Sequence, residues 1–227
     1  MKLFKNIKKW LENQEHLFYL FLLILIVPNI ILCFTEPMPV VAKVCNVLLP
    51  FAFYYLLMTL SRNCGKMFWI LFLFIFFGAF QIVLLYLFGQ SIIAVDMFLN
   101  LVTTNSSEAM ELLDNLVPAL VSVIILYIPA LILAAISIIK KRKLSPEFIR
   151  RERKKAWITL LIGFISLGAA YGLDKRYELK SDLYPANVCY NVALAFQRNA
   201  QTTAHQRTLL LTPSLPIRKT GAKFILW

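Results

Sequence analysis

The stretch LFYLFLLILIVPNIILCF, residues 17–34, decides the fold of this chain. It carries no charged side chain, and crossing the hydrocarbon core of a bilayer takes about 20 helical residues. Because no water is present there to pair with backbone groups, such a run is expected to be a helix. Four further stretches meet the same test. The five predicted spans are 17–34, 41–60, 67–88, 116–139 and 156–173.

The composition supports an all-α, polytopic membrane protein. Of the 227 residues, 59% are hydrophobic, and the mean hydropathy is +0.70. The net charge of +12 is also typical of nucleic-acid-binding proteins. The basic residues, however, lie between the apolar runs, where membrane topology is a sufficient reason for them, so we predict no nucleic-acid partner. Four cysteines form no CxxC pair and have no nearby His, which indicates neither a metal site nor a disulfide framework.

Residues 1–16 are predicted to form an amphipathic helix lying on the membrane surface. Apolar residues recur at helical spacing between Leu3 and Leu11, and lysines lie largely on the other side. A small-residue cleavage site does not follow the first span, so we expect this segment to be retained as an anchor.

The charges of the loops predict the orientation. Basic residues gather in 1–16, at Arg62 and Lys66, and in 140–155, which reads KKRKLSPEFIRRERKK. The loops 35–40 and 89–115 contain acidic residues and no Lys or Arg. Since Lys and Arg accumulate in cytoplasmic loops, the N-terminus is predicted inside and the C-terminus outside.

Ionisable residues are scarce within the spans, which weakens a transport function, because transporters place several such groups at mid-membrane. Lys43 is the exception. A side chain that snorkels from near the outer end of its span to the head groups would explain it, and a functional role is the alternative. Asn29 and Asn46 are polar enough to tie helices together. Pro28, Pro50, Pro118 and Pro129 are expected to kink their spans.

The outer loop 89–115 reads GQSIIAVDMFLNLVTTNSSEAMELLDN and is too long for a simple connector. Its pattern predicts two short helices, the second beginning near Ser106. Asn100 and Glu108 would flank the turn between them, where an amide and a carboxylate suit an ammonium head group such as ethanolamine. The alternative is that Glu108 and Glu111 only favour a helix N-terminus and face solvent.

After the fifth span, residues 174–201 are predicted to form an outer connecting segment, with a helix begun by Pro185. Residues 202–227 show no clear periodicity and are predicted to be an irregular tail.

Two segments together carry a resemblance to a known family. The outer loop has the form D-x-x-x-N-x-x-x-T-N-x-x-E-A, from Asp96 to Ala109, and YPANVCYN follows the last span. With five spans and a basic loop before the last one, the chain resembles the N-terminal membrane domain of lipid A phosphoethanolamine transferases, in the alkaline-phosphatase and sulfatase superfamily. The resemblance covers about residues 1–200.

The resemblance implies a bacterial inner-membrane enzyme with its C-terminus in the periplasm. Its membrane domain would hold phosphatidylethanolamine, and a zinc-dependent outer domain would transfer phosphoethanolamine to lipid A through a Thr nucleophile. The candidate head-group residues in this chain are Asn100, Thr104 and Glu108.

The chain departs from the family where the catalytic domain should begin. A G-E-T-x-R segment with the nucleophile, and zinc-binding Asp, Glu and His, are expected there; this sequence has only His16 and His205. We therefore expect a chain truncated after about Gln201, inactive alone, with no cofactor and no catalytic residue of its own, and with a separate catalytic domain as a possible partner. The alternative is a non-enzymatic small membrane protein: a scaffold, an assembly factor or a permease subunit.

Overall fold

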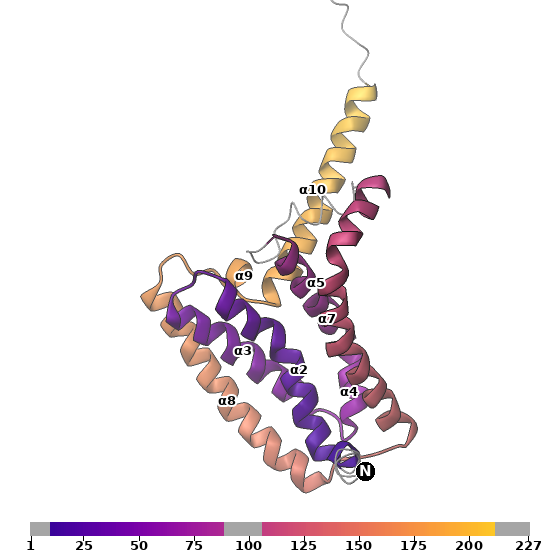
Figure 1. The fold of residues 1–227 in the computed structure, drawn as a ribbon. Coiled ribbons are helices and arrows are strands. Elements are labelled where there is room, and N and C mark those ends of the chain that lie inside the picture. The colour runs from indigo at the N-terminus through magenta and orange to yellow at the C-terminus, as the bar shows by residue number, and fades with distance from the viewer. Residues whose placement is uncertain (1–9, 89–105, 212–227) are drawn as a thin grey trace, which may run out of the picture.

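The structure is a computed structural model that describes residues 10–88 and 106–211. Most of the predicted amphipathic segment, the first part of the outer loop and the end of the tail lie outside these ranges. The described residues are helical and contain no strand. Their helices are α2 (Gln14–Thr35), α3 (Val40–Met58), α4 (Cys64–Ile70), α5 (Phe72–Phe88), α7 (Ser106–Ile139), α8 (Pro146–Leu173), α9 (Leu179–Asp182) and α10 (Ala186–Leu211) (Figure 1).

Four of these helices are long and apolar enough to cross a membrane, and α4 with α5 gives a fifth span if the pair crosses as one. The two helices meet at Leu71 with a bend of 62°. The apolar pattern predicts one helix over 67–88, whereas the structure has two helices there. Neither Pro nor Gly lies at the break, and these are the usual sequence signals of a kink. The bend therefore depends on tertiary packing that the apolar pattern does not reveal.

The helix α8 begins ten residues before the predicted start of the fifth span. Ser145 is its N-cap, with a side chain that accepts a hydrogen bond of 3.1 Å from the Phe148 backbone N–H, and Pro146 occupies the first turn. Most of the basic segment that we expected as a loop is therefore helical, and its side chains have fixed positions around α8.

Two other boundaries differ from the sequence predictions. The helix α7 runs without interruption from Ser106 to Ile139, so the second predicted loop helix is its first part. At 34 residues and 1.5 Å per residue, α7 is about 50 Å long and exceeds the hydrocarbon core. The helix α10 continues to Leu211, ten residues beyond the predicted start of the irregular tail, and projects away from the bundle (Figure 1).

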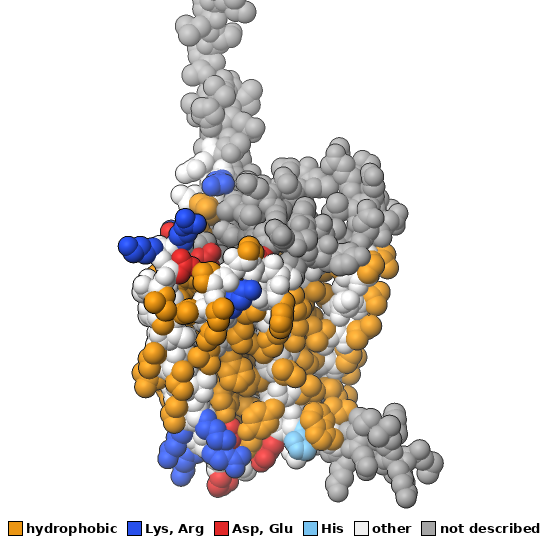
Figure 2. Space-filling view, turned by 60° about the vertical axis from the view of Figure 1, so that its left-hand side comes forward, with side chains coloured by type: hydrophobic (Ala, Val, Ile, Leu, Met, Phe, Trp, Pro, Cys, Tyr) orange, Lys and Arg blue, Asp and Glu red, His pale blue; other side chains and the backbone are white. Residues whose placement is uncertain are grey.

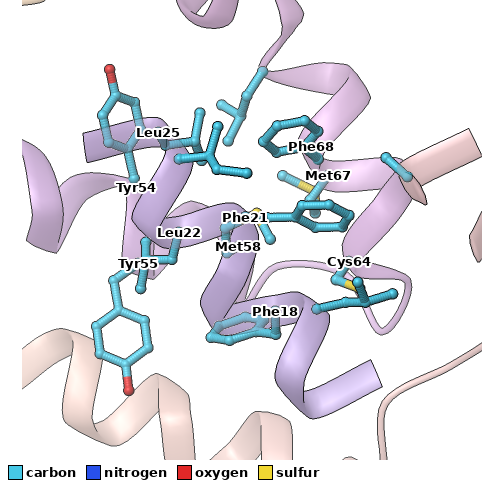
Figure 3. Close-up of a cluster of buried hydrophobic side chains, with 14 of the residues drawn as sticks. Phe18, Phe21, Leu22, Leu25, Tyr54, Tyr55, Met58, Cys64, Met67 and Phe68 are labelled. Atoms are coloured by element: carbon cyan, nitrogen blue, oxygen red, sulfur yellow. The ribbon is translucent and has the colours of Figure 1, made fainter. Parts of the chain in front are cut away.

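Aromatic and aliphatic side chains of α2, α3, α4, α5, α7 and α8 form the main core, and Figure 3 labels those from α2, α3 and α4. Phe21 of α2 stacks on Phe68 of α4, with ring centroids 4.4 Å apart. Gly65 of α4 allows a close approach to α7, because a Cβ at this position would overlap the Ala134 carbonyl oxygen. The core is thus built by close helix contacts over the half of the bundle that contains residue 10, which we call the N-terminal end.

A buried carboxylate joins α8 to α3 near this end. Glu152 is fully buried and accepts hydrogen bonds from the Tyr55 hydroxyl, from Arg151 Nε at 2.8 Å and from Lys155 Nζ at 3.0 Å. The charge of Glu152 is therefore neutralised within the protein, and the residue serves to hold α8 against α3.

The outer surfaces of α7 and α8 are apolar. Figure 2 shows a band of hydrophobic side chains between two ends where charged side chains gather. Ile125, Ile158, Leu161 and Ile165 are each more than 60% exposed. An exposed apolar band of this kind needs lipid around it, and it supports the assignment as a multi-pass membrane protein.

Candidate lipid-binding site

The residues predicted to bind a head group are not brought together in the part of the chain that the structure describes. Asn100 and Thr104 lie outside the described residues. The backbone of Glu108 lies in the first turn of α7, and the structure does not describe its side chain. The candidate site is therefore built from the neighbouring elements at the end of the bundle from which α10 projects, which we call the α10 end.

The segment YPANVCYN, residues 184–191, packs into the α10 end of the bundle. The Asn29 amide of α2 donates one hydrogen bond of 2.8 Å to the Asn46 carbonyl oxygen and a second of 2.8 Å to the Tyr184 carbonyl oxygen. The Tyr184 hydroxyl donates to the Phe74 carbonyl oxygen of α5 at 3.0 Å. The backbone carbonyl and the side-chain hydroxyl of Tyr184 thus both bond the connecting segment to the spans.

Asn46 of α3 adds two more bonds to this segment. Its amide donates to the Asp182 carbonyl oxygen at 2.6 Å and accepts from the Tyr177 hydroxyl at 3.0 Å. Burial raises the pKa of Tyr177, so its phenol remains a neutral donor. The prediction that Asn29 and Asn46 tie helices together is confirmed. Their main partners, however, belong to the segment after the last span.

An apolar pocket of about 340 Å³ opens beside this segment. Its walls come from α3, α5 and α8 and from residues 179–189 of the connecting segment. The lining residues are Leu49, Pro50, Phe53, Phe74, Leu160, Phe164, Leu179, Leu183, Pro185, Ala186 and Cys189. Every lining side chain is apolar or a thiol, which suits the hydrocarbon chain of a lipid and gives no means of holding a charged group.

A second groove, of about 430 Å³, lies on α2 and α3 at the same end. It is lined by Cys33, Val40, Val44, Val47, Leu48, Phe51 and Lys43. The Cys33 thiol donates to the Lys43 carbonyl oxygen at 3.3 Å, which fixes the two helices together at the groove. Lys43 is half-buried, and it is the one ionisable ammonium group along this wall. A phosphate at the membrane surface would find a cation here above an apolar wall.

One buried residue of the segment was missed by sequence reasoning. Asn187 is fully buried, and neither atom of its side-chain amide has a hydrogen-bond partner among the residues that the structure describes. A buried amide without partners costs about 1 to 3 kcal/mol. The motif YPANVCYN contained this residue, but only the buried position distinguishes it from a solvent-exposed Asn.

The zinc that the resemblance implies has no ligand set in the described part of the chain. Among residues 10–88 and 106–211, no group of three His, Cys, Asp or Glu side chains is placed to hold a metal ion. The described residues therefore do not fit a zinc centre, and no catalytic step is assigned to them.

The fold and the site define an all-helical, multi-pass membrane protein with apolar pockets at its α10 end. Comparisons of the chain with protein-family models, curated proteins and solved structures found no match.

Proposed function

We propose that this chain is the membrane-anchoring and donor-lipid-binding part of a phosphoethanolamine transferase that modifies lipid A. The observation that carries the proposal is the apolar pocket at the α10 end. Four of its lining residues, Leu183, Pro185, Ala186 and Cys189, lie in or next to the segment YPANVCYN, on which part of the family resemblance rests. The segment would thus form one wall of an acyl-chain site.

The proposed orientation places the α10 end in the periplasm of a bacterial inner membrane. At the N-terminal end, basic residues greatly outnumber acidic ones, through Arg62, Lys66 and the segment 140–155. The α10 end is balanced. Its charged residues in the described ranges are Glu36, Lys43, Asp174, Lys175, Arg176, Glu178, Lys180 and Asp182, together with Glu108, Glu111 and Asp114 of α7 and Arg198 and Arg207 of α10. The excess of Lys and Arg at one end favours the cytoplasm for that end.

The head group of phosphatidylethanolamine carries an ammonium and a phosphate. In the proposal, the amide of Asn100, the hydroxyl of Thr104 and the carboxylate of Glu108 bind the ethanolamine part. Glu108 belongs to the first turn of α7, and a carboxylate there is also favoured by the helix dipole. Lys43 supplies a cation at the same end of the bundle, where a phosphodiester would lie.

The transfer of phosphoethanolamine requires a catalytic domain, which would bind zinc and act on the periplasmic side. The helix α10 leads from the pocket away from the membrane and would place such a domain above the donor lipid. The described residues would bind and present the donor, and chemistry would depend on that partner domain.

A scaffold or an assembly factor is the second candidate. The observation that favours it is α10, a helix of 26 residues that extends beyond the bundle and offers a surface for a partner protein. A scaffold would not need a pocket that selects one lipid, so lipid selectivity separates it from the first proposal. A permease subunit would need polar groups along a path through the spans.

Binding of phosphatidylethanolamine to the purified full chain in detergent, measured by native mass spectrometry, tests the proposal. Asn100→Ala and Glu108→Ala are expected to weaken binding about tenfold. The matched control is Glu111→Ala, which removes an equal charge one helical turn away. If all three variants bind as the wild type does, the head-group assignment is wrong.

A further inference from the structure

A basic pocket of about 380 Å³ lies at the N-terminal end, where the first turns of α8 pass the loop that follows α3. Its lining consists of four cations, Arg62, Arg150, Arg153 and Lys154, and three apolar residues, Pro146, Ile149 and Trp157. Residues 149, 150, 153, 154 and 157 recur at helical spacing, so they share one face of α8. A cytoplasmic location is a sufficient reason for basic residues in this segment. It does not require that four of them line one pocket.

Two of the four cations are held in place by backbone carbonyl groups of the protein. Arg62 Nε donates to the Leu144 carbonyl oxygen at 3.1 Å, and Arg153 Nη2 donates to the Thr59 carbonyl oxygen at 2.7 Å. A guanidinium group carries five N–H donors, so each arginine retains donors for a ligand. These side chains are ordered before any ligand binds, which lowers the entropy lost on binding.

Among the described residues, none of the four cations forms an ion pair with a carboxylate, and this includes the exposed Glu147 in the first turn of α8. Glu152 lies on a different face of α8. Its carboxylate accepts a hydrogen bond from Tyr55 and forms ion pairs with Arg151 and Lys155. In the described ranges, the ion pairs made by α8 both involve Glu152, and neither includes a residue that lines the pocket. The pocket therefore keeps an uncompensated positive charge.

The pocket borders the apolar band. Trp157 is 57% exposed, and Ile158 and Leu161, which follow it on α8, are more than 60% exposed. Trp is typical of the interface between head groups and hydrocarbon. A ligand with both phosphate groups and an acyl chain would therefore contact the cations and the apolar side chains at once.

We propose that this pocket binds a phospholipid with two phosphate groups, of the cardiolipin type, with its phosphates on Arg62, Arg150, Arg153 and Lys154 and an acyl chain along Trp157. Basic pockets at the ends of membrane helices bind such head groups. The lipid would clamp the start of α8 to the loop between α3 and α4. This site is independent of the donor-lipid pocket at the other end.

Native mass spectrometry of the full chain with added cardiolipin tests this site. The variant Arg150→Gln/Lys154→Gln is expected to bind cardiolipin about thirtyfold more weakly, since each of the two removed charges contributes about 1 kcal/mol to attraction. The control, Lys140→Gln/Lys143→Gln, removes the same charge from the same end outside the pocket and is expected to bind as the wild type does.

Two results would overturn the proposal. One is equal weakening by both pairs, which indicates diffuse surface charge; the other is no weakening by the pocket pair. A third variant, Trp157→Ala, keeps every charge. It is expected to weaken binding of cardiolipin and to leave binding of inorganic phosphate unchanged, and equal effects on both ligands would show that the pocket takes a free anion and no lipid.

Discussion

The Asn29 side chain joins the first membrane helix to the Tyr184 carbonyl oxygen, 155 residues further along the chain, through a hydrogen bond of 2.8 Å. The same amide group bonds the Asn46 carbonyl oxygen of α3. One residue thus connects two spans and the segment that leads into α10. Any domain carried by α10 is thereby held at a defined position relative to the apolar pocket.

Replacement of this residue is expected to loosen the connecting segment. Asn29→Leu removes both bonds and should lower the free energy of unfolding by about 1 to 3 kcal/mol, as membrane hydrogen bonds are individually modest. Thermal unfolding in detergent measures the loss, and limited proteolysis between residues 174 and 186 should become faster. Ser122→Ala is the control, because Ser122 is exposed and bonds only its own helix, at the Pro118 carbonyl oxygen. Unchanged proteolysis in Asn29→Leu would contradict the role of this amide.

Two helical glycines should respond to substitution in opposite ways. A Cβ on Gly65 would overlap the Ala134 carbonyl oxygen of α7, whereas a Cβ on Gly168 meets no atom within 4 Å. Gly65→Ala is expected to destabilise the bundle by about 1 to 3 kcal/mol. Gly168→Ala should stabilise it by up to about 1 kcal/mol through helix propensity. Thermal unfolding of both variants checks the pair, and a stable Gly65→Ala protein would show that α4 and α7 are further apart.

How far the sequence predicts this fold depends on whether the signal is local. The spans follow from apolar length, and Ser145 with Pro146 is a local helix start that could have placed α8 correctly. The bend at Leu71 has no local signal. Asn29 and Asn46 could be recognised as polar groups in apolar runs, but their partners Tyr184 and Asp182 are distant in sequence and follow only from the three-dimensional packing.

The candidate site was predictable only in part, for the same reason. The motif residues around Glu108 can be read from their spacing. The apolar pocket is formed by side chains from α3, α5, α8, α9 and α10 and from the turn between the last two. Nothing in the sequence marks these residues as neighbours. The burial of Asn187 likewise depends on how α10 packs.

Filling the apolar pocket should block the donor lipid. Ala186→Trp puts an indole into the space that an acyl chain would occupy, and we expect binding of phosphatidylethanolamine to weaken about tenfold at unchanged thermal stability. Ile165→Trp on the exposed apolar face of α8, where Ile165 is 64% exposed, is the matched control. Equal binding by the two variants would mean that the lipid lies elsewhere.

The orientation can be tested with single cysteines introduced into a variant whose four native cysteines are replaced by serine, because the native Cys189 is exposed and would also be labelled. Lys175→Cys, after α8, and Lys141→Cys, before it, are both exposed positions at opposite ends of the bundle. In spheroplasts, a membrane-impermeant thiol reagent should label Lys175→Cys directly and Lys141→Cys only after permeabilisation. The reverse pattern would place the basic end outside and would contradict the proposed periplasmic position of α10.

The most direct test of the central claim is head-group selectivity of the purified full chain, measured by native mass spectrometry with equimolar phosphatidylethanolamine and phosphatidylcholine of the same acyl chains. The proposal predicts preferred binding of phosphatidylethanolamine by about tenfold, because its ammonium group donates hydrogen bonds that a trimethylammonium group lacks. Equal binding of the two lipids would contradict a donor-lipid site and favour the scaffold.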